Sequence, residues 1–356
     1  MNRNLKPQKM KKTLIGLLAL TLMFSCKNAE DKNENAENEK QELNVYTHRH
    51  YESDQDLFKQ FEEETGIKVN VINASADELI QKMRMEGEQS PADVLITVDA
   101  GRLERAKSSD LLQAVSSDIL EETIPSHLKD ADNYWFGLTK RARVIAYAKD
   151  RVDENELSTY EDLASDKWND KLLIRSSGNI YNQSLMASII VHNGEEEAKK
   201  WAEAVVENMA RAPKGNDRDQ VKAVVAGEGD LAVVNTYYIG KLLNSEDPEE
   251  VKAGESIELF FPNQEGRGTH INVSGAGVAK HAPNKENAVK FIEFLISEEA
   301  QKIFAHSNYE YPVNEDVAPA TLLQEWGEFK EDTLNLSTLG ENNKKAVMLF
   351  DEAGWK

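Results

Sequence analysis

The feature that most constrains the fold is a regular alternation of strand-like and helix-like segments that begins at Leu43. Short runs of β-branched and other apolar residues alternate with segments whose apolar residues recur every three or four positions. The first half predicts strands at residues 43–47, 67–72 and 92–98 and helices at residues 56–65, 76–87 and 100–112. Successive strand–helix–strand units form a mainly parallel sheet with helices on both faces. The pattern therefore predicts an α/β fold.

Two long strands interrupt this alternation, at residues 138–148 and 269–279, and we expect them to cross between two parts of the fold. The second half further predicts strands at 171–175 and 231–235 and helices at 182–192, 200–208, 217–226 and 238–243. An amphipathic helix is expected over residues 287–305, followed by a helical tail that ends at Trp355. The length from residue 43 onward suffices for two domains of roughly 150 residues each.

The first 26 residues are typical of a secretion signal. Residues 1–12 contain five basic residues and no acidic residue, and residues 14–24 are apolar but too few to span a bilayer comfortably. Ser25 and Cys26 end this run and resemble a bacterial lipoprotein signal, in which the cysteine becomes the lipidated N-terminus. Residues 27–42 are polar and aperiodic, which indicates a flexible tether. We therefore expect a lipid-anchored protein at the periplasmic face of the inner or outer membrane.

Composition excludes several classes of function. The formal net charge is −21, with 63 acidic against 42 basic residues, whereas nucleic-acid binding requires a basic surface. Cys26 is the only cysteine, so the folded part has neither disulfides nor a thiolate metal site. Neither a Gly-x-Ser-x-Gly nor a His-Glu-x-x-His motif occurs, so we expect no enzyme and no catalytic residue. A purely adhesive or structural lipoprotein would leave the clustered tyrosines described next without a role.

Four of the ten tyrosines lie at predicted strand-to-helix junctions. Tyr51 follows the first strand directly after His50, Tyr181 precedes the helix at 182–192, and Tyr237 and Tyr238 join residues 231–235 to the next helix. Ligands of open α/β sheets bind beyond the carboxyl ends of the strands, and helix N-termini favour anions. Half-buried packing would explain one such tyrosine. Three junctions from both halves of the chain instead predict a cleft between two lobes.

Ferric ion is the ligand that suits this set of side chains. Phenolate is a hard anionic donor with an ordinary pKa of about 10, and a small, highly charged cation displaces its proton most readily. Calcium and magnesium prefer carboxylates and carbonyls, and zinc prefers Cys, His and carboxylate. Four phenolates exceed the charge of Fe³⁺ by one, so a nearby cation is expected. Arg141 and Arg143 have strand spacing and face the same side, either toward such a site or as a surface ion-pair row.

Several separate motifs carry a family resemblance over residues 43 to about 311. They lie at residues 47–51 (THRHY), 90–101 (SPADVLITVDAG), 138–144 (LTKRARV), 180–184 (IYNQS) and 235–238 (NTYY). Together they resemble the ferric-ion-binding solute-binding proteins of ABC transporters. The resemblance implies the type II periplasmic binding-protein fold, with two α/β lobes of mixed, mainly parallel sheets joined by two crossing hinge strands. The implied lobes comprise residues 43–138 with 275–320, and residues 139–274 with 321–356.

The resemblance also implies a ligand set and a function. The implied iron ligands are His50, Tyr51, Tyr181, Tyr237 and Tyr238, and Lys241 stands where an arginine is common near the metal. A monomer would capture Fe³⁺ in the interlobe cleft, with or without an accompanying anion, and deliver it to an ABC-transporter permease in the inner membrane. The alternative is a carrier of a small organic or inorganic anion held by Arg141, Arg143 and helix N-termini without metal. A membrane-bound iron sensor is also compatible with the sequence.

Overall fold

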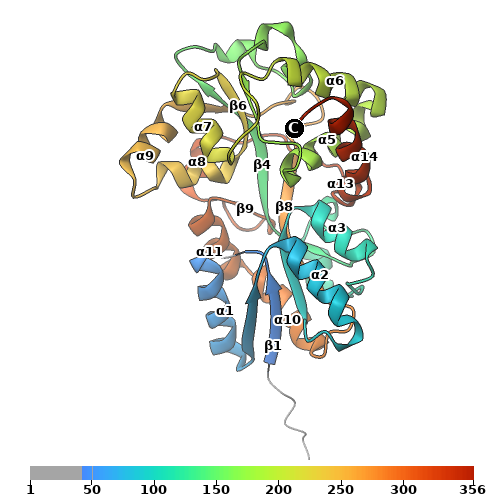
Figure 1. The fold of residues 1–356 in the computed structure, drawn as a ribbon. Helices are drawn as coiled ribbons and strands as arrows, with labels where there is room; N and C mark the ends of the chain where they lie inside the picture. Colours follow the sequence, from blue (N-terminus) through green and yellow to red (C-terminus); the bar gives the residue numbers. More distant parts are fainter. Residues whose placement is uncertain (1–41, 50) are drawn as a thin grey trace, which may run out of the picture. The chain divides into compact units, whose positions relative to one another are not determined.

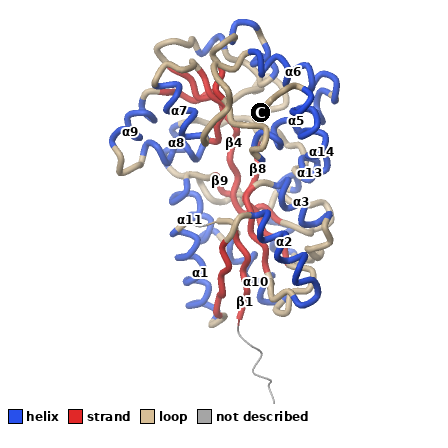
Figure 2. The backbone as a smooth tube through the Cα atoms, in the orientation of Figure 1, coloured by secondary structure: helices blue, strands red, loops and turns tan. Residues whose placement is uncertain are grey.

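The computed structural model contains a continuous mixed sheet, and its described residues hold nine strands (Figures 1 and 2). Seven of them lie in the order β2-β1-β3-β8-β4-β6-β5, and β7 and β9 each pair with β4 outside this path. The structure describes residues 42–49 and 51–356. The predicted signal with its lipidated Cys26, the tether up to residue 41, and the candidate ligand His50 lie outside the described residues. Glu42, predicted as the last residue of the tether, instead begins the first strand.

The first half of the chain follows the predicted order of strands and helices. Its elements are β1 (Glu42–Thr47), α1 (Glu52–Thr65), β2 (Lys68–Asn73), α2 (Ala76–Glu86), β3 (Val94–Val98), α3 (Ala100–Ser108), α4 (Asp118–Thr123) and the long crossing strand β4 (Phe136–Ala148). In Figure 1, α1 lies on one side of the β1–β3 strands, and α2 and α3 lie on the other. This arrangement covers both faces of the parallel strands, as the alternation predicts.

The second half adds further helices around the other end of β4. Its elements are β5 (Leu172–Leu173), α5 (Ile180–Asn193), α6 (Glu195–Glu207), α7 (Asp217–Val225), β6 (Leu231–Asn235), α8 (Thr236–Leu243), α9 (Pro248–Glu255), β7 (Ile257–Phe260), β8 (Ile271–Val278), α10 (Lys285–Leu295), α11 (Glu298–Asn308), β9 (Tyr311–Pro312), α12 (Thr321–Glu325), α13 (Ser337–Glu341) and α14 (Asn343–Glu352). None of the helices in the described part of the chain is long and apolar enough to cross a membrane.

The pairing directions bring the strand ends together. Among the strands of the described residues, parallel pairing joins β1 with β2, β1 with β3, and β5 with β6, whereas the crossing strands β4 and β8 run antiparallel to their neighbours. The carboxyl end of β3 pairs with Ser274, which lies opposite Thr139 of β4. The carboxyl end of β6, Asn235, lies opposite Arg143. The ends of β3 and β6 therefore approach the same short stretch of β4 from opposite directions.

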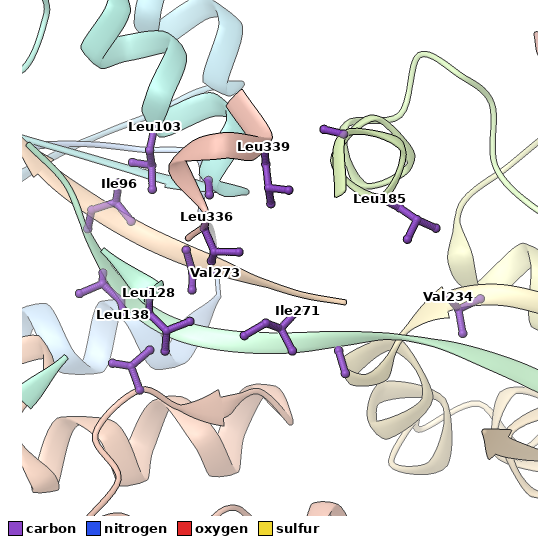
Figure 3. Close-up of a cluster of buried hydrophobic side chains, with 14 of the residues drawn as sticks. Ile96, Leu103, Leu128, Leu138, Leu185, Val234, Ile271, Val273, Leu336 and Leu339 are labelled. Atoms are coloured by element: carbon purple, nitrogen blue, oxygen red, sulfur yellow. The ribbon is translucent and has the colours of Figure 1, made fainter. Parts of the chain in front are cut away.

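One hydrophobic core runs along these crossing strands. Every residue of β3, β6 and β8 is buried, which explains the mainly apolar sequences of β3 and β6. Figure 3 shows part of the core, in which Leu339 of α13 and Leu336, the residue before that helix, lie near Leu103 of α3 and Val273 of β8. The continuous packing holds β4 and β8 firmly between the two parts of the sheet.

The structure corrects one prediction about the C-terminal helices and agrees with another. The single helix expected at residues 287–305 is broken into α10 and α11, because the Ser297 hydroxyl accepts a hydrogen bond from the backbone N–H of Ala300 and caps a new helix. The predicted helical tail consists of the three helices α12, α13 and α14. Its final segment packs firmly, since the buried Trp355 ring lies 5.9 Å from Trp201 and 4.6 Å from Phe350 between ring centroids.

Candidate metal centre

The four candidate tyrosines lie at the beginnings of three helices. Tyr51 is the N-cap of α1, Tyr181 is the second residue of α5, and Tyr237 and Tyr238 occupy the first turn of α8. The hydroxyls of Tyr181 and Tyr237 are 3.1 Å apart and share a hydrogen bond. The rings of Tyr237 and Tyr238 lie with centroids 4.2 Å apart. The structure thus brings three phenols from two separate junctions into one cluster.

Tyr51 is connected to this cluster through Lys241. The Lys241 ammonium, one turn after Tyr237 on α8, lies 3.7 Å from the centroid of the Tyr51 ring and 5.5 Å from that of the Tyr237 ring. Such an ammonium is attracted to the negative face of each aromatic ring. Lys241 therefore contacts aromatic residues that come from opposite parts of the sheet.

Three of the four phenols are held in their neutral form by their surroundings. Burial raises the pKa of Tyr51, Tyr237 and Tyr238 well above the ordinary value; the neighbouring Tyr181 adds to the effect on all three, and the Glu310 charge adds to it on Tyr51. A cation that binds here must displace these protons, so its affinity must fall with acidity. Among the described residues, no group of three or more His, Cys, Asp or Glu side chains could hold a metal ion. The oxygen donors gathered here are phenols.

Three guanidinium groups surround Tyr181. The central carbons of Arg141, Arg143 and Arg175 lie 5.6, 5.9 and 5.8 Å from the centroid of its ring. Arg141 and Arg143 face the same side of β4, as their spacing predicts. Sequence reasoning missed Arg175, although its position just before the loop that leads to Tyr181 could have indicated it. The three cations offer the positive charge that a cluster of phenolates would need.

Arg143 is anchored by a buried network, whereas Arg141 retains unused donors. The Arg143 guanidinium donates to Asp217 at 3.0 Å, to Asn235 at 3.1 Å and to Asn182 at 2.8 Å. Arg141 donates from Nη1 to the Ser274 hydroxyl at 3.2 Å, and its buried Nε and Nη2 have no hydrogen-bond partner in the described part of the chain. Arg143 therefore positions the strand ends, and Arg141 can still bind an acceptor.

A second buried ionic cluster supports the Tyr51 end of the site. The Arg49 side chain donates to Asp54 from Nε at 2.9 Å and to Glu310 from Nη1 at 2.9 Å, and it lies 4.9 Å from the centroid of the Tyr51 ring. Burial alone would raise the pKa of Glu310, but the neighbouring positive charges, with Arg49 foremost, together outweigh burial and lower that pKa. Burial also lowers the pKa of Lys241 to about 8. The sequence did not indicate this cluster, because its members are distant along the chain.

A small buried cavity lies behind Tyr181. It has a volume of about 10 Å³, at the lower limit for one water molecule, and is lined by Tyr181 with polar side chains of the crossing strands and strand ends, namely Asp99, Arg141, Arg143, Asn235, His270 and Asn272. Burial raises the pKa of Asp99, which is fully enclosed. The cavity shows that polar groups, rather than apolar packing, fill the space between Tyr181 and the crossing strands.

His270 makes the stability of the fold dependent on pH. Burial and the nearby Arg143 charge lower its pKa to about 3, whereas an unfolded histidine titrates near pH 6.5. The unfolded chain therefore binds more protons between these values, so stability falls as the pH falls through this window. Relative to His270→Gln, the native protein should lose on the order of 1–2 kcal/mol between pH 7 and pH 5. Urea unfolding at each pH measures this loss, with the exposed His281→Gln as control. Equal losses in the native protein and His270→Gln would contradict it.

Comparison with known proteins places the chain in a family. A family model described as "Bacterial extracellular solute-binding protein" matches residues 56–331. The chain is 54% identical over 318 residues to "Iron uptake protein A1" of Synechocystis sp., covering 89% of this chain and 88% of that protein. The match extends over most of both proteins and is not confined to the tyrosine motifs.

Solved structures agree with this assignment. The fold superposes with a TM-score of 0.87 on the Trichodesmium protein IdiA (FutA) in complex with iron and citrate, at 51% identity, covering 88% of this chain and all of that chain. The ferric binding protein of Campylobacter jejuni gives a TM-score of 0.84 at 49% identity, with 88% and 100% coverage. The predicted two-lobed type II periplasmic binding-protein fold is confirmed, and the chain belongs to the bacterial extracellular solute-binding proteins, which are binding proteins rather than enzymes.

Proposed function

We propose that this protein binds ferric iron outside the cytoplasm through tyrosinate ligands and delivers it for uptake. The observation that carries the proposal is the convergence of Tyr181, Tyr237 and Tyr238, with Tyr51 joined to them through Lys241. Relatives named for iron uptake and ferric binding support the same ligand. The proposed ligands are the four tyrosines together with His50, which lies outside the described residues.

Charge balance favours a trivalent cation at this position. Binding Fe³⁺ would convert neutral phenols into phenolates, because a hard, highly charged ion stabilises the deprotonated oxygen. Four phenolates with one Fe³⁺ leave one negative charge. Lys241, Arg141 and Arg175 lie close enough to offset it, as their ring contacts indicate. Arg141 also has free donors for an accompanying anion, and the solved Trichodesmium relative is described with both iron and citrate.

The proposed mechanism is capture by lobe closure. Tyr181, Tyr237 and Tyr238 would bind the ion first from one lobe, and closure would bring His50 and Tyr51 from the other while excluding water. The ion shifts the equilibrium between the open and closed states toward the closed state. The size of this shift equals the difference in the ion's binding free energy between the two states. The closed monomer, tethered through Cys26 to the inner or outer membrane, would dock on an ABC-transporter permease. Protonation of the phenolates or reduction to Fe²⁺ would then weaken ligation.

A visible absorption titration with chelated ferric ion tests the proposal. We expect a tyrosinate-to-iron charge-transfer band that saturates at one iron per chain. In Tyr181→Phe the band should weaken, because one phenolate and the hydroxyl partner of Tyr237 are lost. Tyr134→Phe, which alters a tyrosine outside the cluster, serves as the matched control.

The titration also separates the two binding-protein hypotheses. The specific observation that favours an anion carrier is the pair of unused Arg141 donors. If no band appears and citrate or phosphate alone raises the melting temperature, the protein carries an anion and the tyrosines only line its site. A band that is equal in the native protein and in Tyr181→Phe would reject Tyr181 as a ligand.

A further inference from the structure

Asp99 has a backbone conformation that an L-residue rarely adopts. Its φ is 81° and its ψ is 123°, and it forms the N-cap of α3 directly after β3. Its side chain is completely buried. A strained backbone of this kind persists only where the surrounding contacts hold it in place, and such residues concentrate at functional or moving sites. The contacts of Asp99 therefore show which elements hold this backbone conformation in place.

The Asp99 carboxylate connects three elements that are far apart in the sequence. Oδ1 accepts a hydrogen bond from the hydroxyl of Ser184 on α5 at 2.7 Å and one from the backbone N–H of Gly101 at 2.9 Å. Oδ2 accepts from Asn272 Nδ2 on the crossing strand β8 at 2.9 Å. The Asp99 backbone N–H donates to the carbonyl of Val273 at 2.8 Å. The carboxylate thus joins α3, α5 and β8.

The Ser184 bond crosses between the two parts of the fold. Asp99 follows β3, which pairs with β1, whereas Ser184 lies on α5, after β5 in the part that contains β6. Ser184 comes one helical turn after Tyr181, so the two side chains share a face of α5. The helices approach closely here, since a Cβ built on Gly101 would lie 3.6 Å from Ser184 Oγ and 3.7 Å from Ile180 Cδ1.

We propose that Asp99 and Ser184 form a latch that holds the two lobes closed and keeps the Tyr181 helix in its binding position. The proposal rests on the proposed function and adds positioning residues to it. A hydrogen bond to a buried carboxylate is formed in the closed arrangement and lost when α3 and α5 separate. The latch therefore stabilises the closed state. Its loss raises the fraction of molecules in the open state, from which iron dissociates. Asp99 and Ser184 act through lobe position, without touching the metal.

Ser184→Ala tests the latch, with Ser188→Ala as matched control. Ser188 lies one turn further along α5, is also buried, and its hydroxyl contacts Asp332 at 3.5 Å. We expect Ser184→Ala to release iron to a competing chelator about tenfold faster or more, since hydrogen bonds to charged groups are strong. The charge-transfer band should keep its wavelength, because the ligands are unchanged. Equal release rates for both variants would overturn the latch.

Two further measurements separate the latch from iron binding itself. In metal-free protein, small-angle X-ray scattering should give a larger radius of gyration for Ser184→Ala than for Ser188→Ala. The radius of gyration tests the latch independently of iron binding. If the native protein shows no tyrosinate band, the proposed function is rejected, but the comparison of the two radii still tests the latch. In a double-mutant cycle, Asp99→Asn should change the release rate less in the Ser184→Ala background than in the native protein, because the Ser184 bond is already absent there. Identical radii, or fully additive effects, would reject the latch.

Discussion

Replacing both Tyr237 and Tyr238 with phenylalanine is expected to lower the affinity for ferric ion by more than about a hundredfold, because loss of groups that only support metal ligands already costs 10- to 100-fold. The change removes two oxygen atoms from the first turn of α8 and keeps both rings. Phenylalanine has no proton to exchange for a metal, so the remaining Tyr51 and Tyr181 would leave part of the ion's charge uncompensated. Competition against a chelator such as citrate measures the affinity.

Tyr147→Phe is the matched control for this double variant. Tyr147 is also a buried tyrosine, but its hydroxyl donates to Glu258 at 3.3 Å, outside the phenol cluster. Its replacement should leave ferric affinity unchanged. If Tyr237 and Tyr238 can be replaced together without loss of affinity, iron is not bound by tyrosinate at this junction and the proposed function fails.

Arg49→Met is expected to cost about 3–5 kcal/mol of stability, the usual result of removing one partner from a buried ionic cluster. Arg49 is almost completely buried and compensates both Asp54 and Glu310, which are equally buried. Its loss leaves Asp54 and Glu310 without their ion-pair partner in a poorly solvating interior. Urea unfolding of the metal-free protein measures the change, provided that the slope of the transition stays constant.

Two comparisons show whether the buried charge causes this loss. Arg105→Met removes the cation of an exposed pair with Asp77 and should cost less than about 1 kcal/mol. Adding Glu310→Gln to Arg49→Met should recover part of the lost stability, because it removes one of the two buried carboxylates that have lost their ion-pair partner. A cost for Arg49→Met as small as that for Arg105→Met would show that Asp54 and Glu310 do not depend on Arg49.

Much of the fold could be predicted because the information is local. The buried strands β3 and β6 correspond to mainly apolar runs, and the positions of Tyr51, Tyr181 and Tyr237 follow from where β1, β5 and β6 give way to helices. The break between α10 and α11 was missed because the amphipathic pattern continues across it. Only the capping bond of Ser297 to Ala300 distinguishes two helices from one.

The charged environment of the candidate site could not be predicted. Arg49 and Glu310 are 261 positions apart, and Asp99 and Ser184 are 85 apart. No spacing rule connects such residues, because their contacts arise only when the crossing strands bring the ends of β3 and β6 together. The same reason explains why Arg175 was missed, although Arg141 and Arg143, two positions apart on one strand, were identified together.

The sequence by itself determined the order of strands and helices, the crossing strands and the junctions that carry the tyrosines. Strand and helix patterns repeat within a few residues, so short segments are sufficient to specify them. Only the tertiary structure decided that Tyr181 and Tyr237 share a hydrogen bond, that Lys241 contacts Tyr51, and that Asp99 joins α3 to α5. Those contacts depend on the antiparallel pairing of β4 and β8, which sets how distant segments meet and therefore which charges and phenols become neighbours.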